Sequence, residues 1–221
     1  MGTGACMRII GVIGRKGGSG KTTLAVHLAA ELSARGERVT LVDADPQGSA
    51  AHWAEPGQLP MPVEHRPIGA DVPAWSRWVR SIHGDGFVVL DSPPHLDSAL
   101  GAVIGLSHVA VLPCGPSGLD LVATAETVGL VRDIRNQRGA IAPLMILVPN
   151  RVDKRTASGR ELRTALADMG EPVGPDLHAR TAYADSFNAG AWVGAYAPDS
   201  PAHREIRVLT DQVIKRMGEL V

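Results

Sequence analysis

The segment that decides the fold reads Arg15-Lys16-Gly17-Gly18-Ser19-Gly20-Lys21-Thr22-Thr23. It follows the short apolar run 9–13, which is typical of a buried strand, and precedes an apolar helical pattern that begins at residue 24. A glycine-rich turn between a strand and a helix can bind phosphate, because its backbone N–H groups point inward and the helix N-terminus adds a positive dipole end. Lys21 is placed to reach the β- and γ-phosphates of a nucleotide, and the Thr22 hydroxyl to bind Mg²⁺.

The loop departs from the usual phosphate-loop signature at one position. That signature places a glycine where this chain has Arg15, and Gly14 comes one residue too early. Gly17, Gly18 and Gly20 still allow the backbone to approach a phosphate closely. A dinucleotide-binding turn has no lysine entering the helix, and a turn without a ligand does not require Gly-Lys-Thr-Thr, so both alternatives fit poorly.

Composition favours a soluble α/β domain. The chain has 221 residues, of which 44% are hydrophobic and 20% charged, so it can bury a sizeable core. Aromatic residues make up only 4%, which favours a parallel sheet covered by helices over an all-β sandwich. The net charge of −1 shows no overall nucleic-acid signature, so any DNA contact must come from a local patch or from an oligomer.

The two cysteines and the chain's N-terminus suggest no special processing. Cys6 and Cys114 lie far apart and fit neither a metal pattern nor a disulfide framework. No apolar run approaches the roughly 18 residues of a membrane span, and no secretory signal is visible, so we expect a cytoplasmic protein. Residues 1–6 are expected to be a disordered tail or a vector remnant, and residues 7–221 a single domain.

Short apolar runs alternate with helical patterns along the chain. Strands are predicted over 9–13, 38–42, 87–90, 108–112 and 144–148, with shorter ones within 63–66 and 172–177. Helices are predicted over 22–35, 71–83, 117–138, 158–169 and 200–220. This alternation predicts an α/β fold with a doubly wound, mostly parallel β-sheet and helices on both faces, whose ligands bind at the carboxyl ends of the strands.

Three aspartates stand at or just beyond those strand ends. Asp43 and Asp91 each follow an apolar run directly, and Asp45 lies two residues beyond Asp43. Mg²⁺ prefers oxygen ligands and keeps several waters, so one or two carboxylates suffice to hold it. A further carboxylate near the γ-phosphate can orient the attacking water. Each aspartate alone is typical of a cap or turn, but the combination with the phosphate loop indicates a magnesium-nucleotide site.

Taken together, three segments resemble the deviant Walker-type ATPases, and most closely the ParA family of partition ATPases. They are 16–23, Asp43-Ala44-Asp45-Pro46-Gln47-Gly48 and Leu90-Asp91-Ser92-Pro93-Pro94. Asn150-Arg151-Val152 and the pattern that leads into the last helix are also similar to the family. The resemblance covers nearly the whole chain and implies the P-loop NTPase fold of the ParA/MinD superfamily, in the short form without an N-terminal DNA-binding extension.

The resemblance also implies roles for individual residues. Lys16 matches the family's signature lysine, which reaches the partner subunit's phosphates, and Lys21 and Asp45 match the phosphate-binding lysine and the residue that positions the hydrolytic water. Thr22, Asp43 and Asp91 match positions around the magnesium ion. The residues implied to bind ATP are Gly17, Gly18, Ser19, Gly20, Lys21, Thr22 and Thr23, with Asn150 at the adenine.

For partners, the resemblance implies a homodimer with sandwiched ATP, which binds non-specific DNA of the nucleoid. It also implies slow ATP hydrolysis stimulated by a ParB-like or other small activator protein, and a cargo that is a plasmid, a chromosome region or a protein cluster. No membrane partner is expected. The candidate DNA contacts are Arg151, Lys154, Arg155, Arg160, Arg163, Arg180, Arg204, Arg207, Lys215 and Arg216.

Two other functions stay open within the superfamily. One is a metabolic or assembly enzyme of the dethiobiotin-synthetase type, against which Lys16 and the segment 45–48 argue. The other is a MinD-like ATPase that binds membrane through an amphipathic last helix. The apolar stripe of that helix is Ile206, Leu209, Val213, Met217 and Leu220. Packing of the stripe against the sheet is the favoured interpretation, because no later segment follows to cover it.

Overall fold

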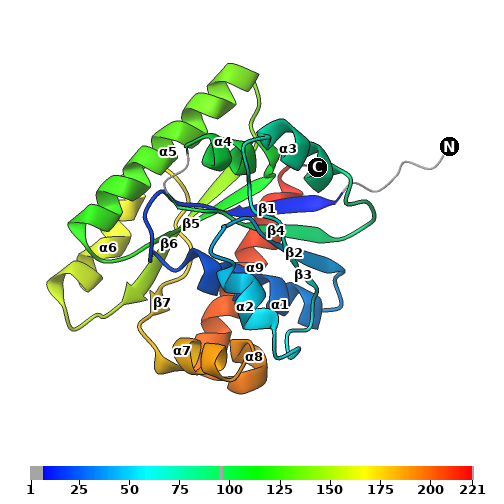
Figure 1. Ribbon diagram of the computed structural model, residues 1–221. Coiled ribbons are helices and arrows are strands. Elements are labelled where there is room, and N and C mark those ends of the chain that lie inside the picture. The colour runs from blue at the N-terminus through cyan, green and yellow to red at the C-terminus, as the bar shows by residue number, and fades with distance from the viewer. Residues whose placement is uncertain (1–6, 95–96, 221) are drawn as a thin grey trace.

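The computed structural model describes residues 7–94 and 97–220, and the predicted tail 1–6 lies outside them (Figure 1). A central sheet runs in the order β3-β2-β4-β1-β5-β6-β7. The strands are β1 (Arg8–Val12), β2 (Val39–Asp43), β3 (Val63–His65), β4 (Phe87–Asp91), β5 (Val109–Cys114), β6 (Leu144–Val152) and β7 (Leu177–His178). All strand pairs among the described residues are parallel, which confirms the predicted doubly wound sheet.

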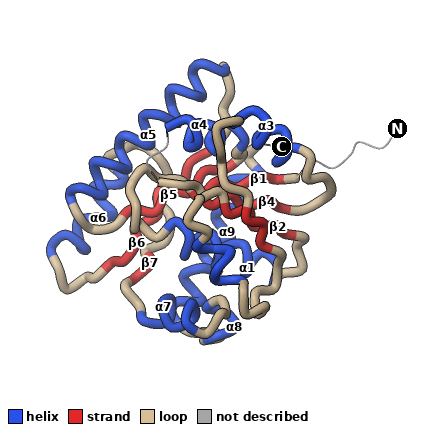
Figure 2. The backbone as a smooth tube through the Cα atoms, in the orientation of Figure 1, coloured by secondary structure: helices blue, strands red, loops and turns tan. Residues whose placement is uncertain are grey.

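Helices cover both faces of this sheet, as Figures 1 and 2 show. One face carries α1 (Lys21–Ala34), α2 (Ser49–Ala54), α7 (Thr181–Asn188), α8 (Val193–Tyr196) and α9 (Pro201–Gly218). The other carries α3 (Val72–Arg80), α4 (Asp97–Leu106), α5 (Gly118–Arg138) and α6 (Ala157–Ala167). The winding direction changes at β1, whose neighbours are β4 and β5, so the ligand crevice is expected at its carboxyl end.

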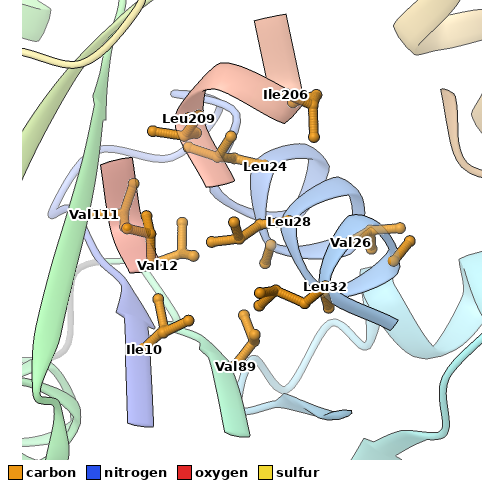
Figure 3. Packing of buried hydrophobic residues seen from close by; sticks show 14 of the residues in the cluster. Ile10, Val12, Leu24, Val26, Leu28, Leu32, Val89, Val111, Ile206 and Leu209 are labelled. Carbon is orange, nitrogen blue, oxygen red and sulfur yellow. The ribbon is translucent and has the colours of Figure 1, made fainter. Parts of the chain in front are cut away.

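Alternate residues of each strand enter opposite cores. In β1, Ile10 and Val12 belong to the core under α1 and α9, whereas Ile9 belongs to the core under α3 to α6. Burial on both faces explains why the strands read as continuous apolar runs. Figure 3 shows the first core, where side chains of β1, β4 and β5 meet Leu24 and Leu28 of α1 and those of α9.

The apolar stripe of the last helix packs in this core. Ile206, Leu209, Val213 and Met217 are buried there, which confirms the predicted packing. The helix begins where the Ser200 hydroxyl accepts a hydrogen bond from the backbone N–H of His203. Among the described residues, no helix is both long enough and apolar enough to cross a membrane.

Several element boundaries differ from the prediction. β6 continues past Val148 to Val152, through Arg151 in the left-handed region at φ 55°. β7 covers only 177–178, and the expected strand within 172–177 is reduced to one isolated bridge between Leu147 and Val173. The helix expected over 71–83 ends at Arg80. The helices α2, α4, α7 and α8 were not predicted.

A close approach between β1 and α4 requires glycine at position 11. A Cβ at Gly11 would lie 2.3 Å from Ser107 Oγ and 3.1 Å from Val103 Cγ1. We expect Gly11→Ala to lower the free energy of unfolding by about 1–3 kcal/mol, because the buried Ser107 must shift. The control is Gly101→Ala in α4, where nothing lies within 4 Å of the new methyl group. For Gly101→Ala we expect the free energy of unfolding to rise by about 0.5–1 kcal/mol. Denaturant unfolding of both variants measures the difference. Equal changes in the two free energies would contradict the packing argument.

Candidate functional site

The phosphate loop leaves β1 and enters α1 through two glycines in the left-handed region. Gly18 has φ 72° and Gly20, which caps α1, has φ 94°. A Cβ at Gly20 would also lie 2.4 Å from Asn150 Nδ2, so this position requires glycine both for its conformation and for space. The Asn150 amide donates to the Ser19 carbonyl at 2.7 Å, so the end of β6 braces the loop.

Lys21 is the buried lysine of the loop. Its ammonium donates to the Lys16 carbonyl at 3.0 Å, so it curls over the loop that precedes it. Burial lowers the pKa of Lys21, while the negative charges of Asp91 and Asp45 oppose that shift. The ammonium is thus largely removed from water, with two carboxylates near it and one backbone carbonyl as its hydrogen-bond acceptor.

A cavity of about 960 Å³ opens above the loop, a volume that accommodates a nucleoside triphosphate. It brings together most of the predicted nucleotide residues. Those that line it are Gly17, Gly18, Gly20, Lys21, Thr22, Thr23, Asp45 and Asn150. Ser19 is buried beneath the loop, where its hydroxyl donates to the Lys16 carbonyl at 3.3 Å.

Other lining residues were missed by the sequence reasoning. They are the α2 residues Ser49, His52 and Trp53 and, from the segment that contains α7, His178, Tyr183 and Phe187. Arg151 and Arg180, which were predicted as DNA contacts, also line the cavity. Trp53 packs edge-on against Phe187, with ring centroids 5.0 Å apart, and donates its indole N–H to the Ala191 carbonyl at 2.9 Å. The aromatic side chains in both segments were the available signal, but nothing local connects residue 53 to residue 187.

Asp91 is the carboxylate whose oxygens stay without partners. It is fully buried at the end of β4, and no hydrogen bond reaches either side-chain oxygen from the described residues. Burial raises the pKa of Asp91 to about 7; Asp43 and Asp45 act in the same direction, and Thr22 and Lys21 oppose them. An orphaned buried carboxylate beside a threonine hydroxyl fits a hard divalent cation such as Mg²⁺, directly or through water.

Asp43 is also buried, but its oxygens are already engaged. Oδ1 accepts from the backbone N–H of Asp45 at 3.2 Å, and Oδ2 from those of Ala50 and Ala51 at 2.8 and 3.0 Å. Burial raises the pKa of Asp43, while these N–H groups lower it. The carboxylate therefore caps the start of α2 and braces the loop before it. Both oxygens of Asp91 are without hydrogen-bond partners among the described residues, whereas Asp43 keeps spare acceptor capacity only on Oδ1, which accepts a single hydrogen bond.

Lys16 lies outside the cavity lining that the structure describes. Its ammonium is 2.7 Å from Asp120 Oδ1 and 3.5 Å from Ser117 Oγ, both at the N-terminus of α5. Burial raises the pKa of Asp120, but the hydrogen bonds from Lys16 and Ser117 outweigh it and hold the pKa below its ordinary value. The Lys16 ammonium is thus paired with Asp120 within the chain, and the side chain is not among the described residues that line the cavity.

Residues 10–191 match the model of the family described as "CobQ/CobB/MinD/ParA nucleotide binding domain". The chain belongs to this family. It is 47% identical over 127 residues to "Maintenance of carboxysome distribution protein A" of Gloeobacter kilaueensis, a match covering 55% of each chain. It is 30% identical over 251 aligned positions to "Chromosome-partitioning ATPase Soj" of Thermus thermophilus, with 97% of this chain and 98% of that one covered.

Solved structures share this fold. The ATP complex of a Cyanothece McdA variant superposes with a TM-score of 0.74 at 16% identity, covering 97% of this chain and 98% of that chain. Pyrococcus horikoshii MinD with Mg-ADP gives 0.72 at 19% identity, covering 97% and 99%. The ligands of those two proteins agree with the predicted ATP and Mg²⁺. The family description includes biosynthetic members, so it is the sequence relatives that favour a positioning ATPase over a metabolic enzyme.

The orphaned Asp91 makes the nucleotide-free protein sensitive to pH. A carboxyl whose pKa rises from 3.8 to about 7 on folding holds its proton more tightly when folded, so stability falls as pH rises through that window and levels off above it. We expect Asp91→Asn to remove this pH-dependent fall in stability. At pH 8 its free energy of unfolding should exceed that of wild type by roughly 1–3 kcal/mol. This difference in the free energy of unfolding between the variant and wild type should decrease towards pH 4.

Thermal unfolding without nucleotide or Mg²⁺ between pH 4 and 8 measures this difference. Asp133→Asn, on the exposed surface of α5, is the control and should follow the wild-type profile. An Asp91→Asn profile parallel to wild type would contradict a raised pKa at Asp91.

Proposed function

We propose that this chain is a ParA-type ATPase that dimerises around ATP, hydrolyses it slowly and positions a cargo along DNA. The observation that carries the proposal is the position of Lys16. Its ammonium forms an ion pair with Asp120, and its side chain is not among the described residues that line the cavity. A loop lysine that does not serve its own nucleotide is suited to the phosphates of a second subunit. A cation supplied in this way, like an arginine finger, contributes roughly 10³–10⁵ in rate.

The other residues then divide the work within one subunit. Lys21 binds the phosphates, and Thr22, Asp91 and Asp43 surround the Mg²⁺, with Asp43 also bracing the loop through its hydrogen bonds to the backbone. Asp45 orients the attacking water from the same cavity. Asn150 is proposed to lie near the adenine, and the hydrogen bond that its side-chain amide donates to the Ser19 carbonyl adds a second role as a brace of the phosphate loop.

DNA binding is proposed as a property of the dimer. Most of the candidate basic residues form ion pairs with acidic neighbours, so one subunit offers only a weak positive surface. The paired residues are Lys154, Arg155, Arg163, Arg180, Arg207 and Arg216. Two subunits would align the remaining charges, and binding of this kind weakens steeply as salt rises. Such a protein would be cytoplasmic and associated with the nucleoid.

The proposed cargo is supported by the names of two relatives. The name of one relative refers to carboxysome distribution and that of the other to chromosome partitioning. The proposed cargo is therefore a large protein assembly or a DNA region. The proposed activator is a small ParB-like protein that stimulates hydrolysis and thereby releases the dimer from DNA. In this proposal, ATP hydrolysis sets how long the dimer stays assembled on DNA, and it is not coupled to the synthesis of a product.

Replacement of Lys16 tests the shared site. Lys16→Ala should retain most of its ATP affinity, because Lys21 and the loop backbone stay in place, while it loses the ATP-dependent dimer, DNA binding and hydrolysis. Light scattering with ATP and Mg²⁺, a DNA mobility shift at low salt and phosphate release measure the three effects. Arg77→Ala, which removes an exposed cation of α3 outside the candidate DNA contacts, is the control. If Lys16→Ala dimerises normally with ATP, the proposal that Lys16 contacts the nucleotide of a second subunit is wrong.

Release of Lys16 from Asp120 should favour the dimer. Asp120→Asn removes the carboxylate charge but leaves the Ser117 cap of α5. Because the ion pair is partly exposed, we expect the ATP concentration that gives half-maximal dimer to fall roughly two- to fivefold. The turnover of the saturated dimer should stay at the wild-type value. An unchanged or higher ATP requirement would mean that Asp120 does not hold Lys16 back.

A further inference from the structure

His65 is the last residue of the edge strand β3 and lies beside the Asp45–Gly48 turn. Its ring nitrogen Nε2 is 3.1 Å from the Asp45 carbonyl oxygen. A carbonyl oxygen only accepts hydrogen bonds, so Nε2 carries the hydrogen and donates it. The backbone strengthens the same junction, because the Arg66 N–H donates to the Asp43 carbonyl at 2.9 Å.

The imidazole ring also packs on the far end of the turn. A Cβ at Gly48 would lie 3.2 Å from both Cε1 and Nε2 of His65. Gly48 has φ 65°, so glycine is required there for the turn's conformation and for the approach of the ring. His65 thus contacts the turn at its first residue through a hydrogen bond and at its last through van der Waals packing.

Within the turn, the carboxylate of Asp45 is tied to the backbone. Oδ1 of Asp45 accepts from the N–H of Gln47 at 2.9 Å, and its carbonyl accepts from the N–H of Gly48 at 3.0 Å. The carboxylate therefore moves with the turn as one unit. Any group that fixes the turn against the sheet also fixes the direction of this carboxylate into the cavity above Lys21 and Thr22.

We propose that His65 is a positioning residue for ATP hydrolysis, which holds the Asp45–Gly48 turn so that the Asp45 carboxylate keeps its place beside the γ-phosphate. It acts through Asp45 and does not touch the nucleotide, since it is not among the residues that line the cavity in the described chain. The inference rests on the proposed ATPase function, because the role of Asp45 is itself part of that proposal.

Two substitutions separate the hydrogen bond from the bulk of the side chain. His65→Leu keeps comparable volume but cannot donate, whereas His65→Gln offers an amide N–H at a similar reach. Since His65 is exposed, both variants should fold normally. Glu64→Ala is the matched control, because it is also exposed on β3 but on the opposite side of the strand.

Steady-state hydrolysis of ATP with Mg²⁺ and DNA gives the first readout. For His65→Leu we expect kcat to fall roughly five- to tenfold, the value of one positioning hydrogen bond, with KM for ATP within about twofold of wild type. His65→Gln should recover most of kcat, and Glu64→Ala should match wild type. Equal kcat for wild type and His65→Leu, or no recovery by His65→Gln, would overturn the proposal.

Hydrogen exchange of the nucleotide-free protein gives a readout that needs no turnover. His65→Leu should speed the exchange of the amides at residues 47–51, and His65→Gln should leave it as in wild type. An unchanged rate in His65→Leu would show that His65 does not hold the turn. If wild type itself fails to hydrolyse ATP, the proposed function is overturned, and with it the positioning role of His65 in hydrolysis. The exchange experiment still decides whether His65 holds the turn.

Discussion

In the central sheet, His65, Asp43, Asp91 and Val12 are register partners on the parallel strands β3, β2, β4 and β1. The carboxyl ends of these strands therefore form one row, and the phosphate loop begins directly beyond its last member. A parallel sheet with both faces buried cannot slip by one residue without turning its apolar side chains to the wrong core. The register that fills the two cores is thus the constraint that aligns the acidic groups with the loop.

Within the part of the chain that the structure describes, two buried charged side chains at this edge of the sheet lack charged partners that bind them directly. Asp91 is buried without hydrogen-bond partners among the described residues, and Lys21 is buried against a backbone carbonyl. Both arrangements cost stability, since desolvated charges need partners. A magnesium ion and a phosphate chain would supply the missing charges at both positions. The apolar cores on both faces of the sheet contribute the free energy that offsets this cost.

The sheet, the phosphate loop and the acidic strand ends were predictable because each is written in consecutive residues. The helix α2 was not predictable, because its cap is a carboxylate seven positions upstream: Asp43 satisfies the N–H groups of Ala50 and Ala51, while the local cap, Gly48, has no side chain. The contact of Lys16 with Asp120 was also out of reach, since it joins segments 104 positions apart. Sequence patterns report local periodicity, and these contacts depend on the assembled sheet.

The strength of the Lys16–Asp120 pair suits a reversible role. The lysine side chain is 36% exposed and the aspartate 14%, so water screens the pair and its rupture is cheap compared with that of a fully buried pair. A fully buried pair would resist release at every encounter with a second subunit. A lysine without any partner would lose more side-chain entropy when it became ordered on a phosphate. Under the proposed role in a second subunit, a partly exposed ion pair would order the Lys16 side chain and still release it for about the free energy of one exposed salt bridge.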